Sequence, residues 1–319
     1  MRKWGWVTLV AAGFTLQCAT AWCEQLAFSR DETQSSYLFD YEWSDSQNAV
    51  HRIRFELDKQ KIDALPFSQK NYRPVLAQRY VTVELLKLAR TYDPRTARID
   101  VRQRDDQILI NVRSRSETHS REILDAFEEA REAAHTDYLH EHYYTRYLTP
   151  LNQQAVKPDH SRYVSENTEA LIPLSQAFYE KVSKYSDARE YFNLLLGWVQ
   201  SIPYDSLEDR AENNGSGFSP PFELLSKNRG DCDSKTVLTA SLARAFLPNT
   251  PMVIVFLREH ALLGVALPPI AGEMTITAGD TTYVLLEPTG PAQISMGQVA
   301  PESQLEINNK QYTIELIGG

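Results

Sequence analysis

The sequence predicts an α+β protein with two domains, and three patterns carry this prediction. Over residues 24–150, segments with strand-like and helix-like spacing follow one another in the order β-β-α-β-β-α. Over residues 163–319, several helical segments are followed by a run of strands. Strands grouped apart from helices are typical of antiparallel sheets in an α+β fold. Between the two regions, Pro150 and Pro158 indicate a linker, predicted over residues 151–162.

The chain begins with a segment that is typical of an export signal. Two basic residues precede an apolar run from Trp6 to Leu16, and the small residues Ala19 and Ala21 suit cleavage after Ala21 or after Cys23. The apolar run is short for a membrane span, which needs about 20 residues; an uncleaved anchor is the alternative. We therefore predict that residues 1–23 are a signal peptide and that the mature protein is periplasmic or secreted.

Residues 24–150 are predicted to form the smaller α+β domain. Two strands fill residues 36–57 around the turn SDSQN, and helical spacing follows over residues 75–92. A second hairpin has ARIDVRQ and QILINVR on either side of RDD, and a long polar helix covers residues 118–147. Since this region shows no catalytic pattern, we expect it to position a substrate or bind a partner.

The second domain, residues 163–319, is predicted to begin with two helices, over residues 166–182 and 186–202. A loop rich in Gly, Pro and Asn follows over residues 203–221, and loops of this kind often line binding clefts. After the short helix FELLSKN, a strongly apolar helix starts at Cys232. The pattern then changes to strands in four segments: MVIVFLREHALLGVAL, EMTITA, TTYVLLEPT and QYTIELI. The predicted architecture is therefore one buried helix against an antiparallel sheet.

Charge and composition limit the partners of the protein. Residues 24–319 carry 31 Lys and Arg against 42 Asp and Glu, a net charge of −11. Such a charge disfavours nucleic acids and anionic membranes as partners. His135, His140 and His142 lack the spacing of about three or four residues that brings metal ligands together on a helix. We therefore expect neither a metal nor another cofactor.

Cysteine usage gives Cys232 a special position. Removal of the signal takes away Cys18 and, if the cut falls after Cys23, that cysteine as well, so Cys232 is the only cysteine certain to remain. An unpaired cysteine in an exported protein indicates a reactive thiol or an intermolecular disulfide, and a small buried cysteine is the alternative. Cys232 follows the flexible Gly230 at the start of a helix, where free N–H groups and the helix dipole favour the thiolate. Asp231 and Asp233 oppose the thiolate by like charge unless they cap the helix.

His260 is the one histidine of residues 163–319. It is predicted on a strand together with Gly264 and Ala266, two small residues that leave room for a helix end. Glu287 ends a later strand, YVLLE. If the two strands are neighbours, the Glu287 carboxylate can hold the second nitrogen of His260, which completes a set of thiol, base and orienting carboxylate. A satisfied core histidine is the alternative.

Five segments, in their order along the chain, resemble the transglutaminase-like superfamily of papain-like thiol enzymes: WVQSIPYD, the Gly/Pro loop, PPFELLSKNRGDCDSKTVLTASLARAF, REHALLGVAL and YVLLEPTG. The likeness covers residues 186–289, and GDCD at a helix start is its most specific part. It implies a papain-like core with Cys232 as nucleophile, His260 as general base and acid, and Glu287 as the orienting residue. The superfamily usually has aspartate in the third role, so Asp280 is the competing carboxylate.

The resemblance also implies a side chain near the oxyanion, about 30 positions before the cysteine, with the N–H of Cys232 as the other donor. Tyr204 is the candidate and Gln200 the alternative. Members of the superfamily attack an amide carbonyl and pass through a thioester. We therefore predict hydrolysis of peptides or proteins, with protein cross-linking by amine transfer as the alternative. A non-catalytic binding or scaffold module that keeps the fold is the alternative of another class.

Overall fold

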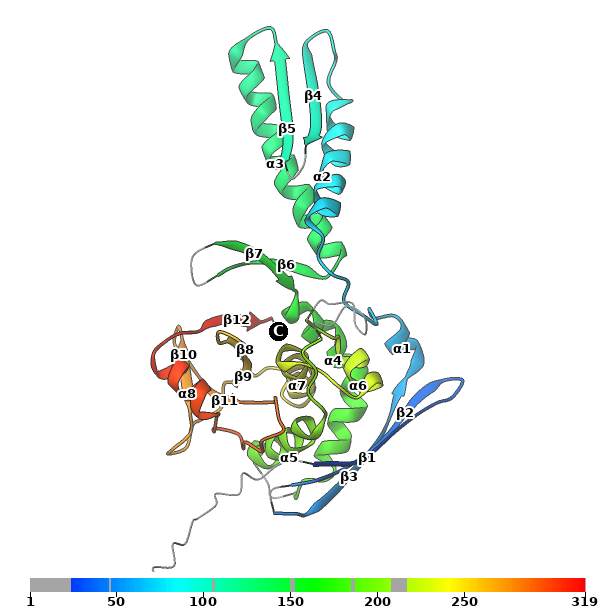
Figure 1. Cartoon of the computed structure of the whole chain (residues 1–319), viewed down its shortest axis with the longest axis vertical. Helices are drawn as coiled ribbons and strands as arrows, with labels where there is room; N and C mark the ends of the chain where they lie inside the picture. Colours follow the sequence, from blue (N-terminus) through cyan, green and yellow to red (C-terminus); the bar gives the residue numbers. More distant parts are fainter. Residues whose placement is uncertain are drawn as a thin grey trace, which may run out of the picture.

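The computed structural model describes residues 24–318 apart from 46, 105–106, 150–152, 185–186 and 208–216 (Figure 1). Helices and antiparallel sheets are both present, which confirms the α+β class. The predicted signal peptide, residues 1–23, lies outside the described residues. No helix in the described part of the chain is long and apolar enough to cross a membrane.

A three-stranded antiparallel sheet opens the described chain. Its strands, in the order β1-β2-β3, are β1 (Glu24–Glu32), β2 (Ser36–Ser44) and β3 (Val50–Asp58). β2 and β3 confirm the predicted hairpin. β1 was not predicted, because it is a mostly exposed edge strand without a clear apolar alternation.

The buried face of this sheet packs on helices of the C-terminal half. Tyr41 of β2 meets Trp198 of α5 (Ala188–Ser201) edge to face, with 5.3 Å between the ring centroids. α4 (His160–Tyr179) covers β3. The predicted first domain, residues 24–150, is therefore not one compact unit. Its first sheet shares the main core with the C-terminal half, because large aromatic side chains on both sides bury their surface against each other.

The next elements form a smaller unit with its own core. They are α2 (Pro74–Ala89), β4 (Ala97–Arg104), β5 (Gln107–Ser114) and α3 (Glu117–Glu141), while the short helix before them, α1 (Lys59–Asp63), packs against β3 of the first sheet. Figure 1 shows α2, α3 and the β4–β5 hairpin projecting from the rest of the molecule. Proline at the first position begins α2, and the Ser116 hydroxyl caps α3 by accepting the His119 N–H at 3.2 Å. The predicted helix and hairpin are thus confirmed.

The predicted linker, residues 151–162, is structured in its described part. α3 ends at Glu141, before the predicted residue 147, and Tyr143 has a left-handed backbone with φ of 58°. β6 (Tyr144–Leu148) then pairs with β7 (Gln154–Pro158), and α4 starts two residues later. Pro158 is the last residue of β7, so the described part of the predicted linker holds a strand and the start of α4.

The C-terminal half places helices between two sheets (Figure 1). Its remaining helices are α6 (Pro221–Lys227), α7 (Cys232–Phe246) and α8 (Pro301–Asn308). Its antiparallel sheet has the order β10-β11-β9-β8-β12, with β8 (Met252–Phe256), β9 (Ala261–Val265), β10 (Thr275–Ala278), β11 (Thr281–Leu286) and β12 (Thr313–Ile317). α4, α5, α6 and β9 all contact α7, which is buried along most of its length. These elements follow the predicted pattern, except that α8 was not predicted.

The face of β9 that meets α7 is not the predicted one. Alternate residues from Ala261 to Val265 belong to the core around α7, whereas Leu262 lies in the cluster on the other face of the sheet. Gly264 is small because a neighbouring strand is close: a Cβ there would come within 2.7 Å of Val253 Cγ2. The glycine thus serves the packing of side chains on the far face of the sheet rather than the approach of the helix.

Candidate active site

Cys232 is the first residue of α7, and its position is fixed by capping contacts. Asp231 is the N-cap, and its Oδ1 accepts the N–H of Ser234 at 2.9 Å. The Ser234 hydroxyl accepts the N–H of Ser219 at 2.7 Å. This second bond links the chain before α6 to the first turn of α7, so both bonds together fix the backbone on either side of Cys232.

The Cys232 side chain favours the thiol over the thiolate. It is a free, partly exposed cysteine, and its Sγ–H donates to Asp233 Oδ1 at 3.4 Å. Burial raises the pKa of the Cys232 thiol well above its ordinary value, and the Asp233 and Asp231 carboxylates raise it further. Burial, with a contribution from Asp233, also raises the pKa of the Asp231 carboxyl to about 8. The expected effect of the helix N-terminus is therefore outweighed, and ionisation of the thiol needs a base.

His260 lies in the turn between β8 and β9, directly before the strand on which it was predicted. Its Nε2 is 3.0 Å from Glu287 Oε1. Glu287 follows β11, is 6 % exposed, and accepts the N–H of Ala300 on Oε2 at 2.8 Å. β9 and β11 are paired neighbours, and the structure thus brings His260 and Glu287 together. A carboxylate acceptor places the proton on Nε2 and leaves Nδ1 as the basic nitrogen.

Cys232 and His260 are each close in sequence to one contact between α7 and β9. Thr236 Oγ1 donates to Ala261 O at 3.2 Å. Thr236 lies about one helical turn after Cys232 on the same helix face, and Ala261 directly follows His260. α7 and β9 thus meet beside both residues, and the Cys232 thiol is hydrogen-bonded to Asp233.

The predicted oxyanion candidate Tyr204 is held beside the turn that precedes the cysteine. Its backbone forms a parallel bridge with Gly230, and the N–H of Asp205 donates to Gly230 O at 3.2 Å. Gly230 is closely packed, since a Cβ there would lie 2.7 Å from Leu224 Cδ1 and 3.3 Å from Ser234 Cβ. Tyr204 is 53 % exposed.

Gln200, the alternative oxyanion donor, uses its side chain for hydrogen bonds within the protein. Its Nε2 donates to Glu287 O and to Ile294 O, both at 2.8 Å, and its Oε1 accepts the N–H of Ile294 at 3.3 Å. Both amide hydrogens are therefore used inside the protein. Gln200 fixes the segment that follows Glu287 on the end of α5, and a Cβ on Gly290 in this segment would overlap Gln200 O. This corrects the expectation that Gln200 could face the oxyanion.

Asp280, the competing carboxylate, lies in the exposed turn between β10 and β11. Glu287 follows the opposite end of β11. Glu287 makes the hydrogen bond to His260. Asp280 is therefore separated from Glu287 by the length of β11.

One residue near the thiol was missed by the sequence analysis. His160, at the start of α4, is 1 % exposed, and its Nε2 lies 3.7 Å from Asp233 Oδ2. It fell in the predicted linker, three positions before the domain boundary, and was not considered with Cys232. The capping pattern was a signal that could have found it, since Asp159 accepts the N–H of Arg162 at 3.1 Å and thereby starts the helix at His160.

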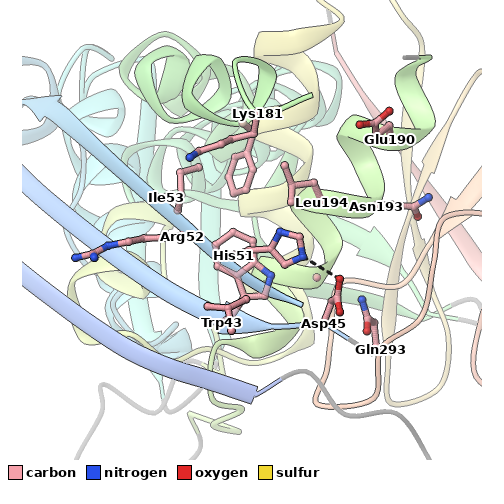
Figure 2. A pocket seen from close by; sticks show the side chains of 13 residues that line it. Trp43, Asp45, His51, Arg52, Ile53, Lys181, Glu190, Asn193, Leu194 and Gln293 are labelled. Atoms are coloured by element: carbon pink, nitrogen blue, oxygen red, sulfur yellow. Dashed lines mark hydrogen bonds and ion pairs between the residues drawn. The ribbon is translucent and has the colours of Figure 1, made fainter. Parts of the chain in front are cut away.

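A cavity of about 430 Å³ lies elsewhere, between β2, β3 and helices α4 and α5 (Figure 2). Figure 2 shows His51 over Trp43, with His51 Nε2 2.9 Å from Asp45 Oδ2. None of the three residues Cys232, His260 and Glu287 lines this cavity.

In the described part of the chain, no group of three or more His, Cys, Asp or Glu side chains is arranged to hold a metal ion. No family model, no curated protein and no solved structure matches this chain. The function is therefore inferred from the geometry around Cys232.

Proposed function

We propose that this protein is a thiol-dependent amide hydrolase of the transglutaminase-like type that acts on peptides or proteins. The observation that carries the proposal is the contact of 3.0 Å between His260 Nε2 and Glu287 Oε1 next to the helix that starts with Cys232. A buried carboxylate is costly unless its oxygens are hydrogen-bonded. Glu287 uses one oxygen for the Ala300 N–H and the other for the imidazole, which is the arrangement that prepares a histidine as a general base.

The arrangement of α7 and β9 supports a papain-like core as the frame of this site. The cysteine begins a buried helix, the helix packs on an antiparallel sheet, and the histidine and the carboxylate flank the ends of two neighbouring strands of that sheet: His260 directly precedes β9 and Glu287 directly follows β11. The chain order Cys232, His260, Glu287 agrees with the resemblance described above, with glutamate in the place of the usual aspartate.

In the proposed reaction, His260 Nδ1 takes the proton of Cys232 Sγ, and the thiolate attacks the carbonyl carbon of the amide. The N–H of Cys232, which has no intrahelical acceptor at the first position of α7, and the Tyr204 hydroxyl donate to the oxyanion. The C–N bond breaks as His260 returns the proton to the departing amine, and a thioester remains. Water then attacks the thioester while His260 takes its proton and passes it to the departing sulfur. Glu287 stabilises the imidazolium in both halves of the reaction.

We propose hydrolysis rather than amine transfer, because water resolves the thioester without a second binding site. The test is incubation of the protein with a glutamine-containing protein and a labelled primary amine, with Cys232→Ala as the control. Fragments that require Cys232 are the expected result. Label incorporation that requires Cys232, without fragments, would instead identify a cross-linking transglutaminase.

The non-catalytic alternative has one observation in its favour, which is the raised pKa of the Cys232 thiol beside Asp233. A scaffold of this kind would have a thiol that resists alkylation at every pH at which the protein is folded. An activated thiol would react with iodoacetamide below about pH 8. Alkylation of Cys232 that depends on His260 is expected, and an inert Cys232 would reject the enzymatic proposal.

We further propose that the protein works outside the cytoplasm, on the basis of the signal-like residues 1–23. Cell fractionation is expected to recover a mature chain that starts near residue 22 or 24 in the periplasm or the medium. Recovery of the full-length chain in the cytoplasm would contradict the proposal.

A further inference from the structure

The cavity between the first sheet and helices α4 and α5 has no role in the reaction proposed above, yet it is built like a ligand site (Figure 2). Its volume of about 430 Å³ falls within the range of about 300–1,000 Å³ that is typical of sites for small molecules. Apolar side chains from three elements line it, namely Trp43, Ile53, Phe178 and Leu194. Charged and amide side chains complete the walls. An apolar hollow with a few polar groups is the usual composition of a small-molecule site.

One face of α5 forms a wall of this cavity. Glu190, Asn193, Leu194 and Gly197 follow one another at steps of three, one and three residues, so they lie on the same side of the helix. Asn193 Oδ1 accepts the N–H of Met296 at 2.8 Å. The NH₂ group of Asn193 is therefore the part of this amide that can donate to a ligand.

Gly197 keeps the cavity open. Glycine inside a helix is less favourable than alanine, so its presence within α5 needs a reason. A Cβ at Gly197 would lie 3.5 Å from Trp43 Nε1 and 3.6 Å from Gln293 Nε2. These are ordinary contact distances, so no clash requires the glycine. The missing side chain instead leaves space between the indole and the Gln293 amide, both of which line the cavity.

Asp45 supplies a fixed negative charge on one side of the cavity. Its Oδ1 accepts the N–H groups of Gln47 at 2.8 Å and of Ala49 at 2.9 Å, and its Oδ2 lies 2.9 Å from His51 Nε2. Burial raises the pKa of the Asp45 carboxyl, but these hydrogen bonds outweigh it and hold the pKa below its ordinary value. Because a carboxylate has about four acceptor positions, Asp45 is charged, held in place and still able to accept a hydrogen bond from a ligand.

Lys181 supplies the opposite charge. It follows α4, and Figure 2 shows Lys181 and Asp45 on different sides of the cavity. Arg52 also lines the cavity, but it donates its Nε to Asp40 Oδ1 at 2.8 Å and is thereby engaged within the first sheet. Lys181 is therefore the basic side chain that can meet an anionic group of a ligand.

We propose that this cavity binds a short apolar peptide with free ends, of about the size of a dipeptide. The ammonium end lies at Asp45, the carboxylate end lies at Lys181, and the apolar side chains pack on Trp43 and Leu194. A ligand with one charge of each sign matches the walls better than an anion or a cation, because each end of such a ligand meets an opposite charge. The site is separate from Cys232, so this inference goes beyond the proposed hydrolase and does not depend on it.

The experiment is calorimetric titration of the full chain carrying Cys232→Ala with leucyl-leucine, so that no peptide is consumed. Saturable binding of one peptide per chain is expected. N-acetylation of the peptide removes its ammonium group and should weaken binding at least about tenfold, since hydrogen bonds between charged groups are the strong ones. Diglycine keeps both charged ends but has no apolar side chain, so it should also bind at least about tenfold more weakly.

Two variants test the walls of the cavity. Lys181→Gln should weaken binding of leucyl-leucine by about two- to fivefold at low salt, as is usual for an exposed ion pair. Lys184→Gln, at an exposed lysine that is not among the described residues lining the cavity, is the matched control and should leave binding unchanged. Gly197→Ala should raise the melting temperature, because alanine is the better helix residue. It should weaken binding, because the added methyl group lies between Trp43 and Gln293.

The proposal is overturned if leucyl-leucine does not bind saturably, or if the acetylated peptide and diglycine bind as tightly as leucyl-leucine. Equal binding by Lys181→Gln and Lys184→Gln, with a stabilised Gly197→Ala that also binds normally, would place the peptide elsewhere and would overturn it as well. Failure of the hydrolase is a separate result. An inert Cys232 would reject that function and leave these titrations unchanged, because they measure binding without turnover.

Discussion

Replacement of Glu287 by glutamine tests the site with the least change in shape. In the native protein, Oε1 faces His260 Nε2 at 3.0 Å and Oε2 accepts the Ala300 N–H at 2.8 Å. Glutamine has one oxygen and one NH₂ group, so only one of these two contacts can be kept. If the NH₂ faces the ring, Nε2 must become the acceptor, and the proton moves to Nδ1, where it blocks uptake of the thiol proton. If the oxygen faces the ring, the NH₂ opposes the Ala300 N–H.

The magnitude follows from the charge that is lost. Two unit charges 3.0 Å apart attract by about 5 kcal/mol at an effective dielectric constant of about 20, which sets the upper limit for stabilisation of the imidazolium. A decrease of ~10²–10⁴ in kcat/KM corresponds to about 3–5 kcal/mol, and the aspartate of serine triads reaches the upper end of this range. We therefore expect Glu287→Gln to lower kcat/KM by ~10²–10⁴.

The assay compares kcat/KM on one cleaved peptide for Glu287→Gln and for Asp280→Asn. Both changes convert a carboxylate next to β11 into its amide, but Asp280 lies in an exposed turn, where a substitution changes stability by less than about 0.5 kcal/mol. Thermal melting confirms that both proteins are folded. Loss of activity in Asp280→Asn with normal activity in Glu287→Gln would show that the wrong carboxylate was assigned to His260.

Three further predictions concern stability. Gln200→Ala removes the hydrogen bonds to Glu287 O and Ile294 O. Since each buried group left unpaired costs about 1–3 kcal/mol, the variant should lose about 2–4 kcal/mol of unfolding free energy in a denaturant titration. An unchanged denaturation midpoint would contradict the role of Gln200. The pKa of Glu315 is held at about 2, below the ordinary value of about 4.3. Its contribution to the free energy of unfolding is therefore present above about pH 4.3 and is lost as the pH falls towards about 2. In Glu315→Gln, the free energy of unfolding should depend less steeply on pH over this range, and the same dependence as in the native protein would refute this. A fragment of residues 160–319 should aggregate on expression, because it lacks the sheet β1–β3 that completes the core around Trp198. A monomeric fragment that melts cooperatively would instead show that residues 160–319 fold independently of that sheet.

The sequence by itself determined most of the secondary structure and the identity of the candidate triad. The apolar spacing of α5 and α7, the capping aspartates and the alternation in the strands are local patterns, and local patterns follow from the backbone geometry of each element. The pairing of His260 with Glu287 was predictable because a strand end positions a side chain once its neighbouring strand is known.

Only the tertiary structure decided the features that join distant parts of the chain. It placed β1–β3 on α4 and α5 rather than in a separate domain, and it used the Gln200 amide to fix the segment after Glu287. It also brought His160 Nε2 to within 3.7 Å of Asp233 Oδ2. These contacts bridge tens of residues and depend on which side chains exclude water from one another. Burial, which only packing decides, therefore adds to the charges of Asp233 and Asp231 in the GDCD motif in raising the pKa of the Cys232 thiol.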